Sequence, residues 1–132
     1  MDRRTSLLAT LTLAAGGAVA GAGEKVGGPS PGGIKVTVLY GHPKSSEDFE
    51  KYYFGTHMPL VAAAKGGKRT ETSKCPPAAD GTPGPFYRIF EIWFENQADM
   101  TAITATPEWK KVVADVPNFA TGGITRVVSM LD

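Results

Sequence analysis

The order of hydrophobic and polar segments predicts an α+β domain of ferredoxin-like type, with the element order βαββαβ, over residues 34–132. Three observations favour this fold: segments with strand alternation open and close the region, a strongly apolar strand lies in its middle, and helical periodicity separates them. The chain has 132 residues, of which 42% are hydrophobic and 20% charged, which is the profile of one globular domain. We therefore expect a single domain preceded by a separate leader.

The first strand and the first helix are predicted at the start of this region. Residues 34–40 (IKVTVLY) alternate as a strand with one buried face, and Pro43 ends it because proline cannot continue a hydrogen-bonded ladder. Ser45 is typical of a helix N-cap and precedes an apolar helical face. Because Pro59 interrupts that helix, we expect a kink or a restart around His57.

The middle of the domain contains a weak strand, a loop and the strongest strand of the chain. Residues 68–74 are mostly polar and are predicted as an edge strand, and residues 75–85 form a flexible loop with four prolines and two glycines. Residues 86–94 (FYRIFEIWF) are aromatic and β-branched, and apolar on both faces except for Arg88 and Glu91. This strand is predicted to contribute apolar side chains to both faces of the sheet.

Two short helices and a last strand complete the domain. Asn96 is a cap for the first helix, and Thr106 followed by Pro107 is typical of the start of the second. The apolar face of the second helix is predicted to consist of Trp109, Val112, Val113 and Val116. Pro117 stops this helix, and residues 124–131 (ITRVVSML) form the last strand.

The predicted sheet has helices on one face, and its other face carries aromatic and aliphatic side chains that a single protomer would expose to water. Two such sheets meeting face to face form a homodimer, a dimeric α/β barrel with an apolar interior suited to a small molecule. From residue 34 onward there are 11 basic and 11 acidic residues, so the charge does not favour nucleic-acid binding. The single cysteine, Cys75, excludes an intrachain disulfide and a cysteine-rich zinc site.

Residues 1–20 have the three-part layout of a secretory signal peptide, with a charged start, an apolar run and a small-residue cleavage site. Arg3 and Arg4 favour the twin-arginine route over the general secretory route, although Ser6 stands where that motif has a large apolar residue. Residues 21–33 are a Gly/Pro-rich linker. We therefore expect a periplasmic or otherwise exported protein with no membrane segment after cleavage; the alternative for the apolar run is a buried first helix.

Three segments of the chain carry a family resemblance. They are IKVTVLYGHP at 34–43, YYFGTHMPL at 52–60 and NFATGGIT at 118–125. Together they resemble the EthD family over residues 34–132, except that the stretch 69–85 is longer and richer in proline. The resemblance implies a dimeric α/β barrel, a role in breaking down or modifying small organic molecules, and a reductase-like oxidoreductase activity. It also implies that the electrons of such a reductase come from a partner or a loosely bound cofactor.

His57 lies in the segment that resembles the family hallmark, and it is predicted as a general acid or base because an imidazole titrates near neutral pH. The alternative is that its ring caps backbone groups freed by Pro59. Asp115 is predicted as a second catalytic residue that orients a substrate from a helix end; in the alternative it is solvated and Asn118 caps a turn. The predicted substrate-binding residues are Tyr40, Tyr53, Asn118 and Thr121.

The sequence contains neither of the glycine-rich patterns of nucleotide-binding loops, so the cofactor is unknown. His42 and His57 alone are too few for a metal site. The predicted function is an exported small-molecule protein, an oxidoreductase or auxiliary enzyme that acts on an apolar organic compound, with His57 as general acid or base. The alternatives are a non-catalytic carrier or haem-binding module of the same fold, and a structural dimer without a ligand.

Overall fold

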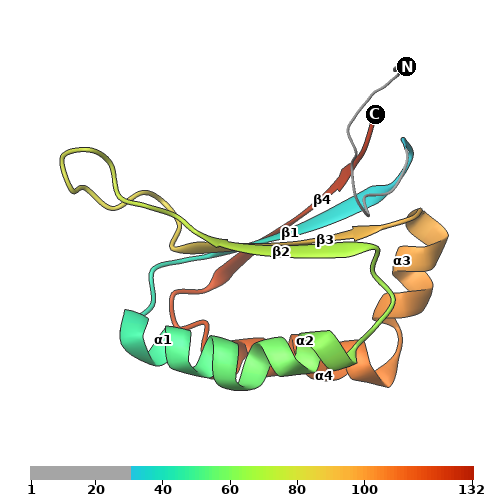
Figure 1. The fold of residues 1–132 in the computed structure, drawn as a ribbon, viewed down its shortest axis with the longest axis horizontal. Coiled ribbons are helices and arrows are strands. Elements are labelled where there is room, and N and C mark those ends of the chain that lie inside the picture. Colours follow the sequence, from blue (N-terminus) through green and yellow to red (C-terminus); the bar gives the residue numbers. More distant parts are fainter. Residues whose placement is uncertain (1–30) are drawn as a thin grey trace, which may run out of the picture.

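The computed structural model describes residues 31–132; the predicted signal peptide and the linker up to residue 30 lie outside the described residues. The described part has the predicted order of strands and helices (Figure 1). The elements are β1 (Ile34–Tyr40), α1 (Ser46–Tyr52), a π-helical turn (Tyr53–His57), α2 (Met58–Ala63), β2 (Arg69–Lys74), β3 (Arg88–Phe94), α3 (Gln97–Thr104), α4 (Pro107–Asp115), a 3-10 turn (Val116–Asn118) and β4 (Ile124–Met130).

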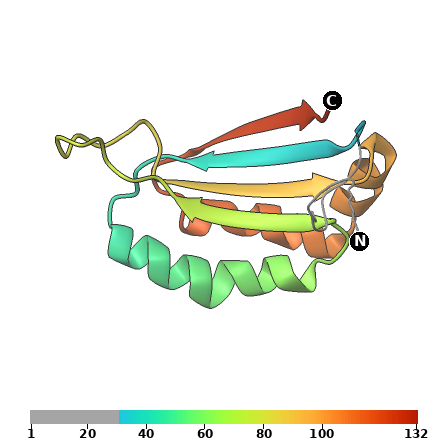
Figure 2. The ribbon, with the colours of Figure 1, turned by 45° about the horizontal axis from the view of Figure 1, so that its top comes forward.

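The four strands form one antiparallel sheet in the order β2-β3-β1-β4. All helices lie on one face of this sheet, with α1 and α2 in front of α4 in Figure 1, and β4 lies at one edge (Figure 2). This arrangement confirms the predicted ferredoxin-like fold. The predicted edge position of the polar strand β2 is also confirmed.

The helices begin where the sequence predicts them to begin. The Ser45 hydroxyl accepts a hydrogen bond from the backbone N–H of Asp48, and the Asn96 side chain accepts one from the N–H of Asp99. The Thr106 hydroxyl caps α4 in the same way. Each cap satisfies a backbone donor that has no partner within the helix, which is why these residue types mark helix starts.

The predicted interruption near Pro59 takes the form of a π-helical turn. In this turn the N–H of Met58 bonds to the carbonyl of Tyr53, five residues earlier instead of four. Proline has no N–H, and its ring crowds the carbonyl four residues before it, which here belongs to Gly55. The wider turn absorbs that conflict just before Pro59 and lets α1 continue into α2.

The hydrophobic core lies between the sheet and the helices and is largely aromatic. Phe49 and Tyr53 stack at 5.3 Å between ring centroids, and Tyr40 meets Phe49 edge to face at 5.4 Å. Phe119, from the loop before β4, packs on Tyr40 at 5.6 Å. Edge-to-face and offset-stacked contacts are the preferred geometries of such rings. They hold the end of β1 to the first helix and to the loop that leads into β4.

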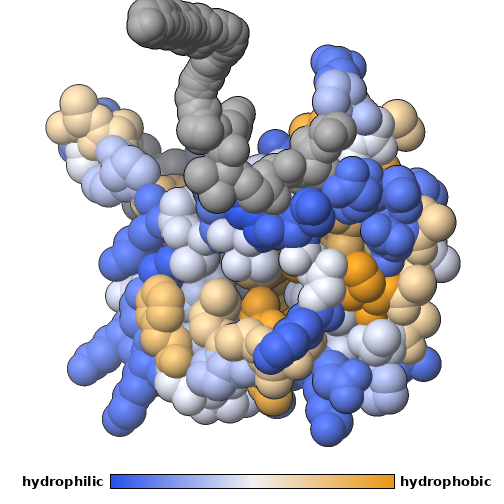
Figure 3. Space-filling model, turned by 45° about the vertical axis from the view of Figure 1, so that its right-hand side comes forward, coloured by the Kyte–Doolittle hydropathy of each residue, from blue (hydrophilic) through white to orange (hydrophobic). Residues whose placement is uncertain are grey.

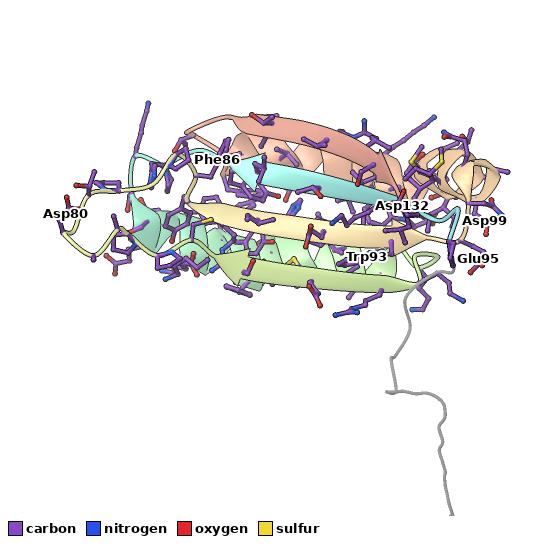
Figure 4. The ribbon with its side chains drawn as sticks, turned by 90° about the horizontal axis from the view of Figure 1, so that it is seen from above. Asp80, Phe86, Trp93, Glu95, Asp99 and Asp132 are labelled. Atoms are coloured by element: carbon purple, nitrogen blue, oxygen red, sulfur yellow. The ribbon has the colours of Figure 1, made fainter. Side chains whose placement is uncertain are left out.

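The open face of the sheet differs from the prediction of an aromatic and aliphatic surface. The strand register places Lys35, Thr37 and Glu91 on this face, and Lys35 forms a 3.2 Å ion pair with Glu91. The apolar residues there are Leu39, Ile89, Trp93 and Val127, and Trp93 can be seen on this face in Figure 4. The prediction therefore holds only in part, because β1, β2 and β3 also direct polar side chains to this face.

The exposed apolar surface lies mainly on β4. This edge strand exposes Val127 on the open face, and it exposes Ile124, Val128 and Met130 on the helix-facing side. Val113, predicted on the buried face of α4, is 66% exposed, whereas Trp109 and Val112 are buried as predicted. Within residues 31–132, no helix is both long and apolar enough to cross a bilayer.

Backbone contacts close the two ends of the sheet. Gly32 donates to the carbonyl of Leu131 at 3.0 Å, and Leu131 donates to the carbonyl of Gly33 at 2.9 Å, so the residues just before β1 pair with the end of β4. At the other end, Gly41 and Gly122 approach so closely that a Cβ on Gly41 would lie 2.3 Å from the carbonyl oxygen of Gly122. Glycine is required at this crossing because no side chain fits.

Candidate active site

His57 and Asp115 form a buried pair in which two helix ends meet. His57 is the last residue of the π-helical turn, Asp115 is the last residue of α4, and their Nδ1 and Oδ2 atoms are 2.9 Å apart. The His57 residue is only 3% exposed. The imidazole therefore bonds to a carboxylate and does not cap the backbone near Pro59, and the carboxylate is not simply solvated.

The Asp115 carboxylate is held by three side-chain donors. Besides His57, the Tyr52 hydroxyl donates to its other oxygen at 2.6 Å and the Asn118 amide donates to that same oxygen at 3.0 Å. Burial opposes ionisation of Asp115, yet the bonds from Tyr52, His57 and Asn118 prevail and hold its pKa below the ordinary value. Asp115 is thus a fixed anion behind the imidazole.

The His57 ring is neutral at physiological pH. Burial lowers its pKa below the usual 6.5, and the neighbouring Asp115 only partly opposes that shift. A neutral ring next to a carboxylate carries its proton on Nδ1, which donates to Asp115, so Nε2 keeps its lone pair. No residue within 31–132 forms a hydrogen bond with Nε2. The ring is also fixed by Phe119, whose centroid is 4.5 Å away.

A cavity of about 470 Å³ lies beside this pair, between the sheet and α4. Most of its wall consists of apolar side chains from three strands, from α4 and from the turn and loop that follow α4: Val36, Val38, Phe90, Ile92, Phe94, Trp109, Val112, Val113, Val116, Pro117, Ala120 and Ile124. The space-filling view shows hydrophobic side chains reaching the surface between polar ones near α3 (Figure 3). The volume is that of a pocket for a small organic molecule. It lies within one protomer, whereas the predicted interior between two facing sheets of a dimer stays a prediction.

Tyr40 and His57 are two polar residues in the wall of this cavity. The Tyr40 hydroxyl has no hydrogen-bond partner within residues 31–132. Unlike Trp109 Nε1, which is fully buried and unpaired, this hydroxyl is not completely buried. Burial, reinforced by the nearby Tyr53, raises the pKa of Tyr40 well above its ordinary value, so the hydroxyl stays protonated and can donate. The polar groups of the cavity wall therefore include an acceptor, His57 Nε2, and a hydroxyl donor, Tyr40.

The other predicted substrate-binding residues do not line this cavity. Tyr53 is fully buried and its hydroxyl bonds to Thr72 at 2.8 Å. Asn118 is exposed and holds Asp115, while the Thr121 hydroxyl accepts a hydrogen bond from the backbone N–H of Lys44 at 2.9 Å. Of the predicted residues, the structure brings together His57, Asp115 and Asn118, with Tyr40 on the same cavity as His57.

Sequence reasoning missed two contributors. Tyr52 is not among the predicted site residues, although it donates the shortest hydrogen bond to Asp115. Arg88, noted as a polar exception in a hydrophobic strand, is buried and pairs with Glu50, with Nη2 2.8 Å from Oε1. A charged residue at an inward position of an apolar strand was the available signal, because such a charge needs a buried partner.

His42 and Cys75 lie elsewhere. His42 Nε2 is 2.6 Å from the carbonyl of Gly84, and both His42 and Cys75 border a separate surface pocket beside the long loop before β3. In the described range, no three histidine, cysteine or acidic side chains lie close enough together to hold a metal ion. His42 and His57 do not share a cavity.

Comparison with known proteins supports the resemblance noted in the sequence. The family model described as "EthD domain" matches residues 42–123. An uncharacterized 11.0 kDa protein of the thcB–thcC intergenic region in Rhodococcus erythropolis is 37% identical over 93 residues, which cover 70% of this chain and 89% of that protein.

Solved structures share the fold. An EthD family protein from Bacillus halodurans is 23% identical with a TM-score of 0.69, covering 76% of this chain and 99% of that one. A hydroxynitrile lyase from Passiflora edulis is 14% identical with a TM-score of 0.63, covering 78% of this chain and 96% of that one. Further neighbours are described as dimeric proteins with a ferredoxin-like fold. From the extent of the family match and the 37% identity, this chain belongs to the EthD family.

Proposed function

We propose that this protein is an enzyme that transfers a proton on an apolar small molecule held in the cavity, with His57 as the base. The observation that carries the proposal is the pair of His57 and Asp115 at 2.9 Å, which fixes the imidazole while leaving Nε2 free beside the cavity. A general base must be unprotonated, positioned and within reach of its substrate. The lowered pKa of His57 meets the first condition, and its contacts with Asp115 and Phe119 meet the second.

The reaction class that suits this arrangement is proton abstraction next to a carbonyl group. Nε2 takes a proton from the carbon, the C–H electron pair moves to form a C=C bond, and the carbonyl oxygen becomes an enolate. Asp115 stabilises the imidazolium that forms, and the Tyr40 hydroxyl can donate to the enolate oxygen. Returning the proton to the same or another carbon regenerates neutral His57, so no electrons are gained or lost by the protein.

The proposed proton transfer differs from the reductase-like oxidoreductase activity that the family resemblance implies. A reductase of this family would need a hydride or electron donor in addition, whereas the positioned imidazole carries out proton transfer by itself. We also propose that the protein is exported and forms a homodimer. Dimeric neighbours and the exposed apolar side chains of β4 support the dimer, and light scattering of the purified protein tests it.

Hydrogen–deuterium exchange on a carbon acid tests the proposed chemistry. The ring ketone 2-tetralone is smaller than the cavity and has acidic C–H groups next to its carbonyl. In D₂O, we expect the protein to accelerate deuterium incorporation at those positions, followed by NMR. His57→Gln should lower the protein-dependent rate by about 10²- to 10⁴-fold, the usual contribution of a general base.

Two further variants complete the experiment. Asp115→Asn should also lower the exchange rate, because an amide favours the wrong imidazole tautomer and no longer stabilises the imidazolium. Thr121→Val is the matched control, since Thr121 is exposed and lies outside the cavity wall. Equal exchange by the protein and by His57→Gln would contradict the proposal.

A carrier is the second candidate, and the mostly apolar wall of the cavity favours it. A carrier should bind 2-tetralone without accelerating exchange, and its affinity should be the same in the His57→Gln variant. The haem-binding version of this alternative would give the purified protein a Soret band.

A further inference from the structure

The wall of the cavity formed by β4 contains one charged side chain, Arg126. Apart from Tyr40, His57, Thr104 and the indole of Trp109, the rest of the wall is apolar. A guanidinium keeps its charge across the physiological pH range. A permanent positive charge therefore borders an apolar volume of about 470 Å³.

The register of the sheet shows on which side of β4 this charge lies. Arg126 is opposite Val38, and Ile124 is opposite Tyr40, in the antiparallel pair of β1 and β4. Val38 and Tyr40 belong to the helix-facing side, so Arg126 shares that side and lies away from the open face. Diagonal neighbours in such a pair have Cβ atoms about 7–8 Å apart, which places the Arg126 and Tyr40 side chains within reach of one small ligand.

Arg126 has no acidic partner within residues 31–132, unlike the other two arginines of the domain. Arg88 pairs with Glu50, and Arg69 pairs with Glu71. The acid nearest in sequence on α4, Asp115, is already held by Tyr52, His57 and Asn118 and does not line the cavity. The counter-charge of Arg126 is therefore left to solvent or to a ligand.

We propose that Arg126 binds the anionic group of the ligand, and that the ligand class is an amphipathic carboxylate. Its ring or chain would lie against the apolar wall, and its carboxylate would pair with the guanidinium at β4. A guanidinium matches a carboxylate with two parallel hydrogen bonds, which orients the ligand as well as holding it. This inference rests on the proposed function, since it assigns the substrate class of the same cavity.

The proposed pairing also orients the reacting part of the ligand. With its carboxylate at β4, the apolar body must extend across the cavity toward β1 and α4, the side on which Tyr40 and His57 lie. Arg126 is then a specificity-determining residue that does not touch the reacting carbon.

A pair of ring compounds of equal size separates charge from shape. The compound 2-naphthoate carries a carboxylate where 2-naphthamide carries a neutral amide. In calorimetric titrations of the purified protein, we expect 2-naphthoate to bind more tightly than 2-naphthamide. Arg126→Gln should weaken the binding of 2-naphthoate by about 10- to 100-fold, the range of a charge-assisted hydrogen bond, and change that of 2-naphthamide by less than about twofold.

Two arginine variants serve as controls. Arg126→Lys should recover part of the affinity for 2-naphthoate, because it keeps the charge and loses the two-pronged geometry. Arg69→Gln, on the open face of the sheet, should change neither affinity. Higher salt should weaken 2-naphthoate binding alone, since an exposed guanidinium is screened by ions.

Three results would overturn the inference. Equal affinity of the protein for the two compounds would rule out an anion subsite at Arg126 and would leave the proposed proton transfer in the cavity untouched. If neither compound binds, both the anion subsite and the proposed ligand-binding function of the cavity are ruled out. If Arg126→Gln weakens the dimer and leaves the 2-naphthoate affinity unchanged, the guanidinium pairs with a second copy of the chain instead.

Discussion

Two polar clusters are buried on the helix-facing side of the sheet, and they differ in how many of their atoms have partners. The Arg88 guanidinium contacts Glu50 through Nε and Nη2 and donates from Nη1 to Thr72 at 3.1 Å, and its carbon is 5.0 Å from the centroid of the Tyr53 ring. In the second cluster, Asp115 accepts three hydrogen bonds, but His57 uses only Nδ1.

Burial alone does not distinguish these clusters, since Arg88 is 4% exposed and His57 is 3% exposed. The difference lies in the remaining hydrogen-bonding capacity. A buried polar group with all its partners stabilises and specifies the fold, whereas a nitrogen without a protein partner beside a cavity is available to a ligand. We therefore assign the Arg88 cluster to stability and the His57 cluster to chemistry.

Removing Arg88 should have the largest effect on stability. Arg88→Met leaves Glu50 without its charge partner, and we expect a loss of about 3 kcal/mol in the free energy of unfolding, measured in urea. The His57 pKa, followed by NMR, should not change. Lys110→Met, on the exposed side of α4, is the control and should stay within about 0.5 kcal/mol. If Arg88→Met lowers the free energy of unfolding by less than about 1 kcal/mol, the Arg88–Glu50 pair contributes no more than an ordinary surface ion pair.

Neutralising the carboxylate of the second cluster should have an intermediate effect on stability and a specific effect on the imidazole. Asp115→Asn replaces charge-assisted hydrogen bonds with weaker ones, at a cost of about 2 kcal/mol. Because Asp115 raises the pKa of His57 against the effect of burial, its removal should lower that pKa further. An NMR titration of the ring nitrogens measures both the pKa and the tautomer. If the pKa and the tautomer of His57 stay the same in Asp115→Asn, Asp115 does not orient the ring.

Lowering the pH should have a smaller effect on stability, and it should separate the titration of His57 from that of the carboxylates Asp115 and Glu50. The pKa of His57 is lowered from 6.5 by burial, so the unfolded chain takes up the proton first and stability begins to fall below about pH 6.5. Hydrogen bonds overcome burial to lower the pKa of Asp115 from 3.8 and that of Glu50 from 4.5, so a second decline follows below about pH 4.5. Urea unfolding of His57→Gln across this range should lack the first decline and keep the second.

A change in the π-helical turn should have the smallest effect. Gly55 has open space around the position of a Cβ, so Gly55→Ala should stabilise the helix by about 0.5–1 kcal/mol in thermal or urea unfolding. The pKa and tautomer of His57 should stay as they are, because the contact with Asp115 is untouched. A changed His57 titration would show that Gly55 itself is needed to position the ring.

Local signals in the sequence predicted most of the fold. The caps at Ser45, Asn96 and Thr106 depend on residues three positions away, and strand alternation depends on residues two positions away, so both can be read from short segments. The interruption near Pro59 was also local. The position of the exposed apolar surface could not be predicted from short segments. It depends on the pairing between strands that are distant in sequence.

The candidate site was predicted only in part for the same reason. His57 and Asp115 were each singled out, but their contact joins residues 58 positions apart. Tyr52 and Tyr53 are adjacent in the segment that resembles the family hallmark, yet the hydroxyl of Tyr53 bonds to Thr72 and that of Tyr52 bonds to Asp115. A helix with regular spacing would not reveal which of two adjacent tyrosines joins the carboxylate.

The hydrogen bonds that join Gly32 and Gly33 to Leu131 place the entry and the exit of the domain side by side. The chain could therefore be circularly permuted by linking these ends through a short flexible connection. New ends could be opened at Asp80, at the tip of the exposed loop before β3 (Figure 4). The same closeness of ends would let the domain be inserted as a unit into a surface loop of another protein, where its cavity could serve as a ligand-responsive module.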